Sequence, residues 1–233
     1  MTSLRWLNKL DLPGDLRKLT VDELHEVSEE IRQVVIESVA KNGGHLSSNL
    51  GNVELTVALH AIFQSPEDKI LWDTGHQAYA HKILTGRLKE MSTLRQLGGI
   101  SGFPTPEESP HDFFITGHEG TGLSQAKGVA RARDMEGKKN AVVCVIGDAT
   151  LTSGMALEAI NNISHYKSNF IIILNDNEMS ISQNVGAMAR YLTSVRTNPV
   201  YRSLKQRVER IFQKIPRFGK PLVQRAEELR HVV

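Results

Sequence analysis

The chain has 233 residues, of which 40% are hydrophobic and 23% are charged, and its formal net charge is +2. This composition supports a packed core and excludes an intrinsically disordered chain. The single cysteine, Cys144, excludes an intramolecular disulfide and a metal site built from cysteines alone. No apolar run approaches the length of a membrane span, and the start MTSLRWLNKL lacks the apolar core of a signal peptide. We therefore expect a cytoplasmic protein that does not enter membranes.

The charge is distributed unevenly along the chain. Residues 202–233 hold nine Lys and Arg against three Glu, so this segment is strongly basic and the rest is slightly acidic. A basic stripe can neutralise the phosphates of a nucleic acid. However, the segment has no Trp and few other aromatic residues for stacking on bases. We therefore favour a solvated helix face, or docking on an acidic partner surface, over nucleic-acid binding.

The first predicted element is a helix that begins after Thr20. Thr20 and Glu23 have the spacing of a capping box, and apolar residues then recur at helical intervals. The sequence Lys41-Asn42-Gly43-Gly44 is a matching stop signal, because glycine tolerates the left-handed backbone that ends many helices. A second helix is predicted for residues 53–63.

Three apolar runs predict strands, at residues 69–73, 141–146 and 170–174. The last two are continuous and rich in β-branched residues, which is typical of strands covered on both faces in a parallel sheet. Helices are predicted between them, at residues 121–135 and 154–163. This alternation predicts a doubly wound α/β fold with a mainly parallel sheet.

Outside these elements the pattern is weaker. Residues 86–117 are rich in glycine and proline and are predicted to form loops. No strand-like run follows Leu174, so we expect the chain to lack the last strands of its sheet. We assign residues 1–192 to the α/β domain and residues 193–233 to a basic, mostly helical segment.

Polar residues follow two of the predicted strands. Asp148 comes directly after one strand, and Asn177 comes shortly after the next. Open α/β sheets bind ligands at the carboxyl ends of their strands. Carboxylate and amide oxygens suit Mg²⁺, which commonly completes its coordination with water and diphosphate oxygens, and Thr150 at the next helix start would offer a donor to an anion. The alternative is that Asp148 only caps a helix and Asn177 only turns a loop.

Four ordered blocks resemble the transketolase-like thiamine-diphosphate enzymes, and among them the 1-deoxy-D-xylulose-5-phosphate synthase family. The blocks are His45-Leu-Ser-Ser-Asn-Leu-Gly51 with the helix that follows it, Trp72-Asp-Thr-Gly-His76 and onward to Gly86, Gly147-Asp148 to Asn162, and Asn175 to Ala187. The resemblance covers residues 20–195. It implies the diphosphate-binding α/β domain of a transketolase-type transferase that uses thiamine diphosphate and Mg²⁺. Such an enzyme condenses pyruvate with glyceraldehyde 3-phosphate, supplies isoprenoid and thiamine biosynthesis, and forms a homodimer.

The resemblance also assigns roles to individual residues. Asp148 and Asn177 match the Mg²⁺ ligands, with the backbone carbonyl of Met179 as a third. His45 and His118 match histidines near the reactive carbon of the cofactor, where an imidazole of near-neutral pKa can handle protons. The residues that match the cofactor-binding positions are His76, Gly117, His118, Glu119, Ala149, Thr150 and Asn177.

The chain departs from the family at Glu119, where a serine is usual, and at Ala149, where a glycine is usual. A carboxylate beside a diphosphate repels it unless the carboxylate points away or a cation offsets it. A methyl group at position 149 is tolerated only if φ there is negative. The family's second and third domains, which hold a catalytic glutamate, are also missing. We therefore expect activity to need a chain that supplies those domains, and the alternative is a non-catalytic remnant or regulatory module that keeps the fold.

For three other histidines we expect no role in the site. His60 and His81 are expected to pack on helices, and His111 is expected at the surface. His76 and His81 lie five positions apart, which is poor evidence for zinc without a supporting carboxylate or cysteine.

Overall fold

The computed structural model describes residues 4–163, 168 and 170–175. The chain divides into two units, Met1–Ser182 and Gln183–Val233, and all the described residues belong to the first. The proposed boundary at residue 192 and the basic segment beyond it lie outside the described residues, as do Asn177 and Met179.

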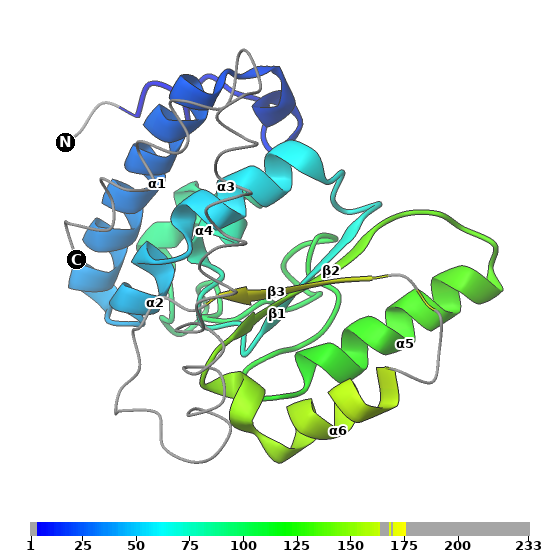
Figure 1. The fold of residues 1–233 in the computed structure, drawn as a ribbon. Coiled ribbons are helices and arrows are strands. Elements are labelled where there is room, and N and C mark those ends of the chain that lie inside the picture. The colour runs from blue at the N-terminus through cyan, green and yellow to red at the C-terminus, as the bar shows by residue number, and fades with distance from the viewer. Residues whose placement is uncertain (1–3, 164–167, 169, 176–233) are drawn as a thin grey trace, which may run out of the picture. The chain divides into compact units, whose positions relative to one another are not determined.

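A parallel sheet in the order β1-β2-β3 lies at the centre of the described unit (Figure 1). Its strands are β1 (Lys69–Asp73), β2 (Val142–Gly147) and β3 (Ile171–Asn175). Asp73 is in register with Ile146, and Gly147 is in register with Asn175. The three strands therefore end at one edge of the sheet, as the sequence pattern predicts.

Six α-helices surround this sheet within the described residues. They are α1 (Val21–Asn42), α2 (Leu46–Leu50), α3 (Val53–Ile62), α4 (Tyr79–Lys82), α5 (Gly122–Met135) and α6 (Gly154–Ile163). Short 3-10 helices occupy Gly14–Lys18, Lys89–Thr93 and Thr150–Thr152, and a π-helical turn occupies Ile83–Arg87. The four longer predicted helices are confirmed. The helices α2 and α4 were not predicted, because four or five residues are too few to show a helical period.

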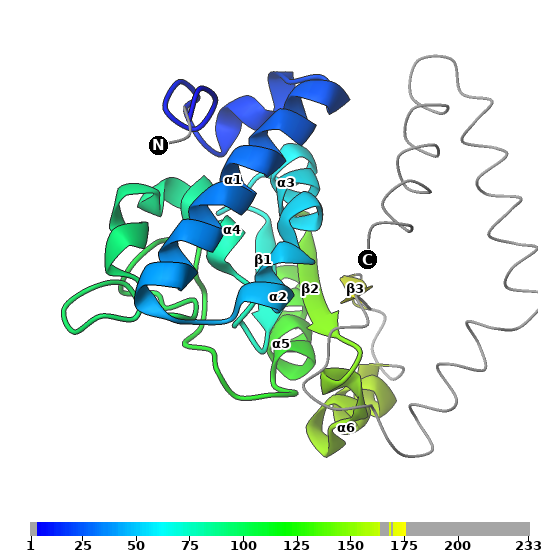
Figure 2. The same ribbon diagram turned by 90° about the vertical axis from the view of Figure 1, so that its left-hand side faces the viewer.

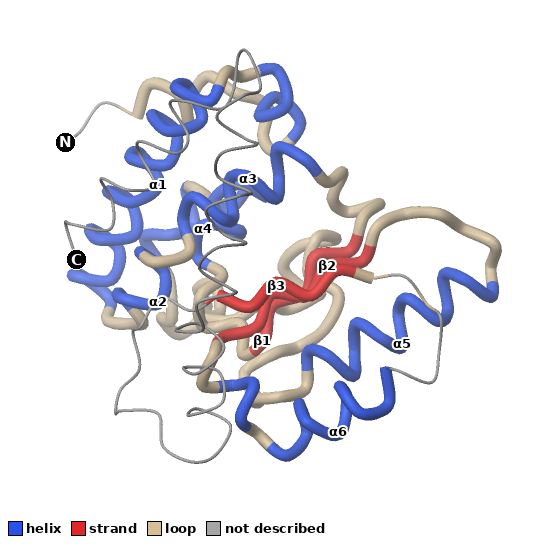
Figure 3. The backbone as a smooth tube through the Cα atoms, in the orientation of Figure 1, coloured by secondary structure: helices blue, strands red, loops and turns tan. Residues whose placement is uncertain are grey.

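Helices cover both faces of the sheet (Figure 3). Alternate side chains of a strand point to opposite faces. On one face, Trp72 and Val145 pack with Leu59 of α3. On the other face, Leu71 and Ile146 pack in one cluster with residues of α5 and α6. The prediction of a doubly wound α/β fold is therefore confirmed.

Helix α1 forms an outer layer on α3 (Figure 2). It starts with the predicted capping box: the Thr20 hydroxyl accepts from the Glu23 backbone N–H at 3.3 Å, and the Glu23 carboxylate accepts from the Thr20 N–H at 2.7 Å. It ends at Gly43, whose φ is +75°. None of the helices in the described part of the chain is long and apolar enough to span a membrane.

One prediction about the sheet is wrong. Strand β2 is buried on both faces, as expected, but β3 is not. The exposed fractions of Ile171, Ile172 and Leu174 are 42%, 41% and 41%. The reason is that β3 lies at the edge of the described sheet and only Ile173 packs into the cluster that includes α3.

Candidate functional site

Four segments meet at the carboxyl edge of the sheet. They are the residues before α2, the β1–α4 loop, the loop before α5 and the β2–α6 loop. Asp73 is the last residue of β1. Asp148 directly follows β2, the strand that pairs with β1. The contacts described below show how the chain brings these segments together.

His45 and His76 lie against each other, although 30 residues separate them in the sequence. Their ring centroids are 5.1 Å apart in an edge-on arrangement, and the ring of Phe103 lies 6.1 Å from that of His45. Burial lowers the pKa of both imidazoles, helped by the charge of Arg95 at His45 and by His45 at His76. Both rings are therefore neutral at pH 7. The Nδ1 atom of His45 is buried and has no hydrogen-bond partner among the described residues.

The loop before α5 is held against the end of β1. The Gly117 N–H donates to the Thr74 carbonyl at 2.9 Å. A Cβ atom at Gly117 would lie 3.7 Å from the Phe103 ring, so Phe103 contacts both this loop and His45. Gly117 has a φ of +125°, a conformation that favours glycine. His118 and Glu119 follow as exposed residues.

Asp73 fixes the start of α5. Its carboxylate accepts hydrogen bonds from the N–H groups of Gly120 at 3.0 Å and Gly122 at 2.9 Å. A carboxylate at this position satisfies N–H groups that have no partner inside the helix and interacts favourably with the helix dipole. Burial raises the pKa of Asp73, and Glu119 adds to this effect, whereas the two backbone hydrogen bonds oppose it.

The β2–α6 loop packs beside the same segment. A Cβ atom at Gly120 would clash with the Ser153 hydroxyl, so the two loops are in direct contact. Ala149 has a φ of −61°, so its methyl group is accommodated as the sequence analysis required. Thr150 is buried, and Asp148 is half-buried at the end of β2.

The predicted site residues thus fall into three groups. His45, His76 and Gly117 are brought together through the contacts of Phe103 and Thr74. Asp148, Ala149 and Thr150 lie on the adjacent loop, and His118 and Glu119 are on the exposed part of the α5 loop. Asn177 and Met179 lie outside the described residues. Within the described ranges, no group of three or more His, Cys, Asp or Glu side chains is placed to hold a metal ion.

Sequence reasoning gave no role to two residues that organise this edge, Asp73 and Asn49. Asp73 is the last residue of β1 and Asp148 directly follows β2, so both lie at the carboxyl ends of strands and the rule that singled out Asp148 would also have found Asp73. Asn49 is fully buried and hydrogen-bonds to both site histidines through their backbone. Its position one helical turn after His45 was a signal too weak to use.

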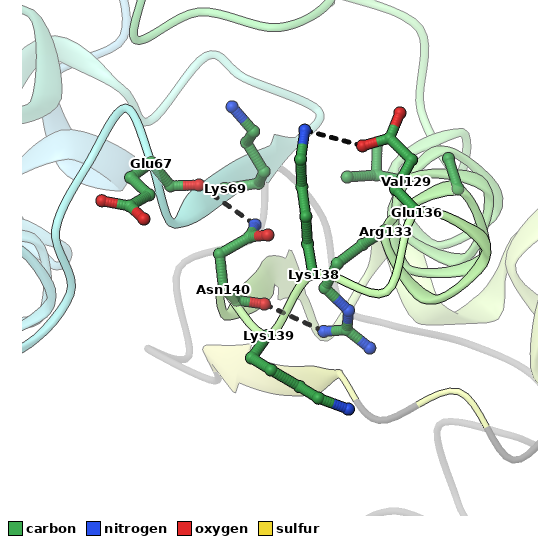
Figure 4. Close-up of a pocket in the computed structure, with 9 residues that line it drawn as sticks. Glu67, Lys69, Val129, Arg133, Glu136, Lys138, Lys139 and Asn140 are labelled. Atoms are coloured by element: carbon green, nitrogen blue, oxygen red, sulfur yellow. Dashed lines mark hydrogen bonds and ion pairs between the residues drawn. The ribbon is translucent and has the colours of Figure 1, made fainter.

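A separate cavity of about 610 Å³ opens at the amino ends of β1 and β2, the end of the sheet away from this site (Figure 4). It is rich in cations, and three of them have protein partners. Lys138 pairs with Glu136 at 2.7 Å, Arg133 donates to the Asn140 carbonyl at 3.1 Å, and Lys69 donates to a backbone carbonyl. We therefore assign the chemistry to the carboxyl edge.

Comparison with known proteins identifies the family. The family model for 1-deoxy-D-xylulose-5-phosphate synthase matches residues 7–233. The chain is 56% identical over 227 residues to the 1-deoxy-D-xylulose-5-phosphate synthase of Syntrophomonas wolfei, and 54% identical over 226 residues to that of Pelotomaculum thermopropionicum. Each of these alignments covers 97% of this chain. A third relative, from Dictyoglomus turgidum, is 57% identical over 89% of the chain.

These relatives are much longer proteins. The chain spans 36%, 35% and 34% of their lengths, so it corresponds to about a third of each. The match spans every described element of the fold, from the turn before α1 to β3. The chain belongs to the 1-deoxy-D-xylulose-5-phosphate synthase family and corresponds to its amino-terminal portion.

Proposed function

We propose that this chain forms the part of a 1-deoxy-D-xylulose-5-phosphate synthase that binds thiamine diphosphate and Mg²⁺. The observation that carries the proposal is the convergence of His45, His76, Asp148 and the Gly117 loop at one edge of a parallel sheet. Ligands bind at this edge in open α/β folds. Membership of the family supports the identity of the cofactor.

The described residues fit a cofactor that carries a diphosphate and a metal ion. Asp148 and Glu119 are acidic, and a diphosphate beside them would be repelled without a bound cation. Asp148 supplies one hard oxygen ligand, and we propose Asn177 and the Met179 carbonyl as the others, as magnesium sites are commonly built with few protein ligands and several waters. The start of α6 after Ser153 offers backbone N–H groups and a positive dipole end to the phosphates.

The histidines fit the proton handling that such a reaction needs. Thiamine diphosphate, once bound, would supply a carbon nucleophile that adds to a 2-oxo acid, whose carboxylate is then lost as CO₂. His45 and His76 are neutral at pH 7 because burial lowers their pKa, and a neutral imidazole can take up a proton. Following the family resemblance, we assign the diphosphate to His76 and the reacting carbonyl to His45. His118, on the exposed loop, is the second candidate for the reacting centre.

The chain spans only about a third of its relatives' length, so we expect the complete reaction to need residues outside it. We propose pyruvate and glyceraldehyde 3-phosphate as substrates, with a homodimer or a partner chain supplying the remaining two-thirds of the family's length. The family name supports the substrates. We propose a homodimer on the basis of the resemblance and a cytoplasmic location on the basis of the composition of the sequence.

Calorimetric titration with thiamine diphosphate, with and without Mg²⁺, tests the proposal. We expect Mg²⁺-dependent binding to the chain that is abolished in Asp148→Ala. Asp134→Ala is the matched control, because Asp134 lies at the opposite end of α5, and its binding is expected to equal that of the unaltered chain. Equal binding by Asp148→Ala, or binding that ignores Mg²⁺, would contradict the metal assignment. No binding at millimolar cofactor would contradict the proposal for this chain and favour the non-catalytic alternative.

A further inference from the structure

Asn49 connects the two site histidines through one buried side chain. Its Nδ2 group donates to the His45 carbonyl at 2.6 Å and to the His76 carbonyl at 2.8 Å. Its Oδ1 atom accepts from the Tyr79 N–H at 2.9 Å. The exposed fraction of Asn49 is 0%, so water does not compete for these hydrogen bonds.

The chemistry of these neighbours requires an amide at this position. Two carbonyl oxygens need two donors, and one backbone N–H needs an acceptor, so only a side chain with both kinds of group satisfies all three. The same requirement fixes the orientation of the amide, because the reversed amide would place its oxygen against two carbonyl oxygens. Aspartate has a similar shape but has no donor when ionised.

The bonds to Asn49 join two segments that are far apart in the sequence, and the buried Asn52 side chain, which donates to the Gln77 carbonyl at 3.1 Å, joins the same segments beside it. His45 precedes α2, a helix of five residues, whereas His76 lies in the loop after β1. Tyr79 strengthens the connection, because its hydroxyl accepts from the His45 N–H at 3.4 Å while its own N–H binds Asn49. The backbone positions of both histidines are thereby set relative to each other, and the 5.1 Å separation of their rings follows.

We propose that Asn49 is a positioning residue that holds His45 and His76 in the arrangement with which they face the cofactor. This inference rests on the proposed function for the ligand, but the arrangement of the histidines can be measured without it. A buried polar residue that orients groups in contact with a ligand or metal commonly changes affinity or activity by roughly 10–100-fold when it is replaced.

The test uses Asn49→Leu in the full chain, since leucine is similar in size and removes all three hydrogen bonds. The first readout is the NMR titration of the two imidazoles. We expect the pKa of His76 to rise towards its ordinary value in Asn49→Leu, because His45 and the burial around it both lower that pKa now. His45→Ala should raise it as well, and the double variant should raise it by less than the sum of the two single effects.

The second readout is the affinity for thiamine diphosphate with Mg²⁺, which we expect to fall by roughly 10–100-fold in Asn49→Leu. Val27→Ala is the control for lost stability alone, because Val27 is fully buried in α1 and takes no part in the hydrogen bonds of Asn49 or in the ring contact of the two histidines. We expect it to lower the melting temperature while leaving both readouts unchanged. If Asn49→Leu does not fold, Asn49→Ser retains one donor, and we expect a smaller change in the same direction.

The outcomes separate this inference from the proposed function. An unchanged His76 pKa in a folded Asn49 variant would overturn the positioning role, whether or not the cofactor binds. A raised His76 pKa in a chain that does not bind thiamine diphosphate would support the positioning role and contradict the proposed function.

Discussion

Asp112 is the centre of a buried charged network, and replacing it gives the strongest test of the packing described above. Its carboxylate accepts from His81 Nε2 at 2.9 Å, from two nitrogens of Arg87 at 2.6 and 3.0 Å, and from the Thr105 N–H at 2.9 Å. The side chains of His81 and Asp112 are fully buried, and that of Arg87 is 6% exposed. Asp112→Asn removes the charge while keeping the shape.

We expect Asp112→Asn to lower the free energy of unfolding by about 3–5 kcal/mol, the usual cost of removing one partner of a buried ion pair. The cost arises mainly from Arg87, which keeps a 3.2 Å ion pair with Glu108 and a 2.7 Å hydrogen bond to the Thr85 hydroxyl as compensation for its lost solvation. Glu108 is itself already paired with the buried Lys82. Urea denaturation followed by tryptophan fluorescence measures the change, since the Trp72 ring lies 5.5 Å from the His81 ring.

Asp134→Asn is the matched control. Asp134 also pairs with an arginine, at 2.7 Å, but its side chain is 32% exposed and solvent can replace the partner. We expect a much smaller loss of stability there. If the two variants lose equal stability, Arg87 is solvated in the folded chain and the reasoning from burial is refuted.

The network also fixes the protonation of two further histidines. Burial alone would raise the pKa of Asp112, but the hydrogen bonds from His81 and Arg87 outweigh it and hold that pKa well below its ordinary value. Because a carboxylate only accepts, His81 donates from Nε2, and its Nδ1 accepts from His60 Nε2 at 2.9 Å. Burial lowers the pKa of both imidazoles, so the proton on each Nε2 atom is the only one. The buried Nδ1 of His60 is then an acceptor that has no partner among the described residues.

Two further predictions concern pH and backbone packing. We expect the free energy of unfolding to fall as the pH decreases from 6.5 towards 4, because burial, helped by nearby His81 and Arg87, lowers the pKa of His111 from 6.5 to about 4. The unfolded chain binds more protons in this window, so urea titrations that give the same stability throughout it would contradict the reasoning. We also expect Gly122→Ala to lower the free energy of unfolding by about 1–3 kcal/mol, since its Cβ would lie 2.6 Å from that of Asp73. Gly128→Ala in the same helix has open space and is expected to be neutral or stabilising by up to about 1 kcal/mol; equal losses in the two variants would show that the close approach to Asp73 is not the cause.

The elements predicted correctly are those whose signal is local. The capping box at Thr20, the glycine stop at Gly43 and the apolar runs of β1 and β2 each lie within a few residues of the structure that they specify. The residue pattern also placed Asp148 correctly, because the carboxyl end of a parallel strand follows from the strand assignment alone. The blocks that carry the family resemblance are also short and local, so they were enough to identify the family.

The parts that were not predicted depend on contacts between distant residues. Asp73 binds the N–H of Gly122, which is 49 positions away. His111, expected at the surface, is half-buried and hydrogen-bonds to Ser65, which is 46 positions away. Neither contact leaves a periodic trace in the sequence, because each depends on a single side chain that meets backbone or hydroxyl groups brought near by the fold.

These distant contacts explain how a segment without regular structure can carry part of the site. The chain from residue 99 to residue 121 is mostly loop, yet carboxylates attach it to the rest of the fold at its middle and at its last residues. Glu108 and Asp112 attach the middle to Lys82 and Arg87, and Asp73 holds the last part at the start of α5. The Gly117 loop lies between these anchors and next to Phe103, which precedes them in the chain and lies against His45. Because a loop has no internal ladder of hydrogen bonds, its order must come from such external attachments. The buried charges therefore reduce the freedom of the segment that faces the proposed cofactor, although none of Lys82, Arg87 and Asp112 belongs to the predicted site.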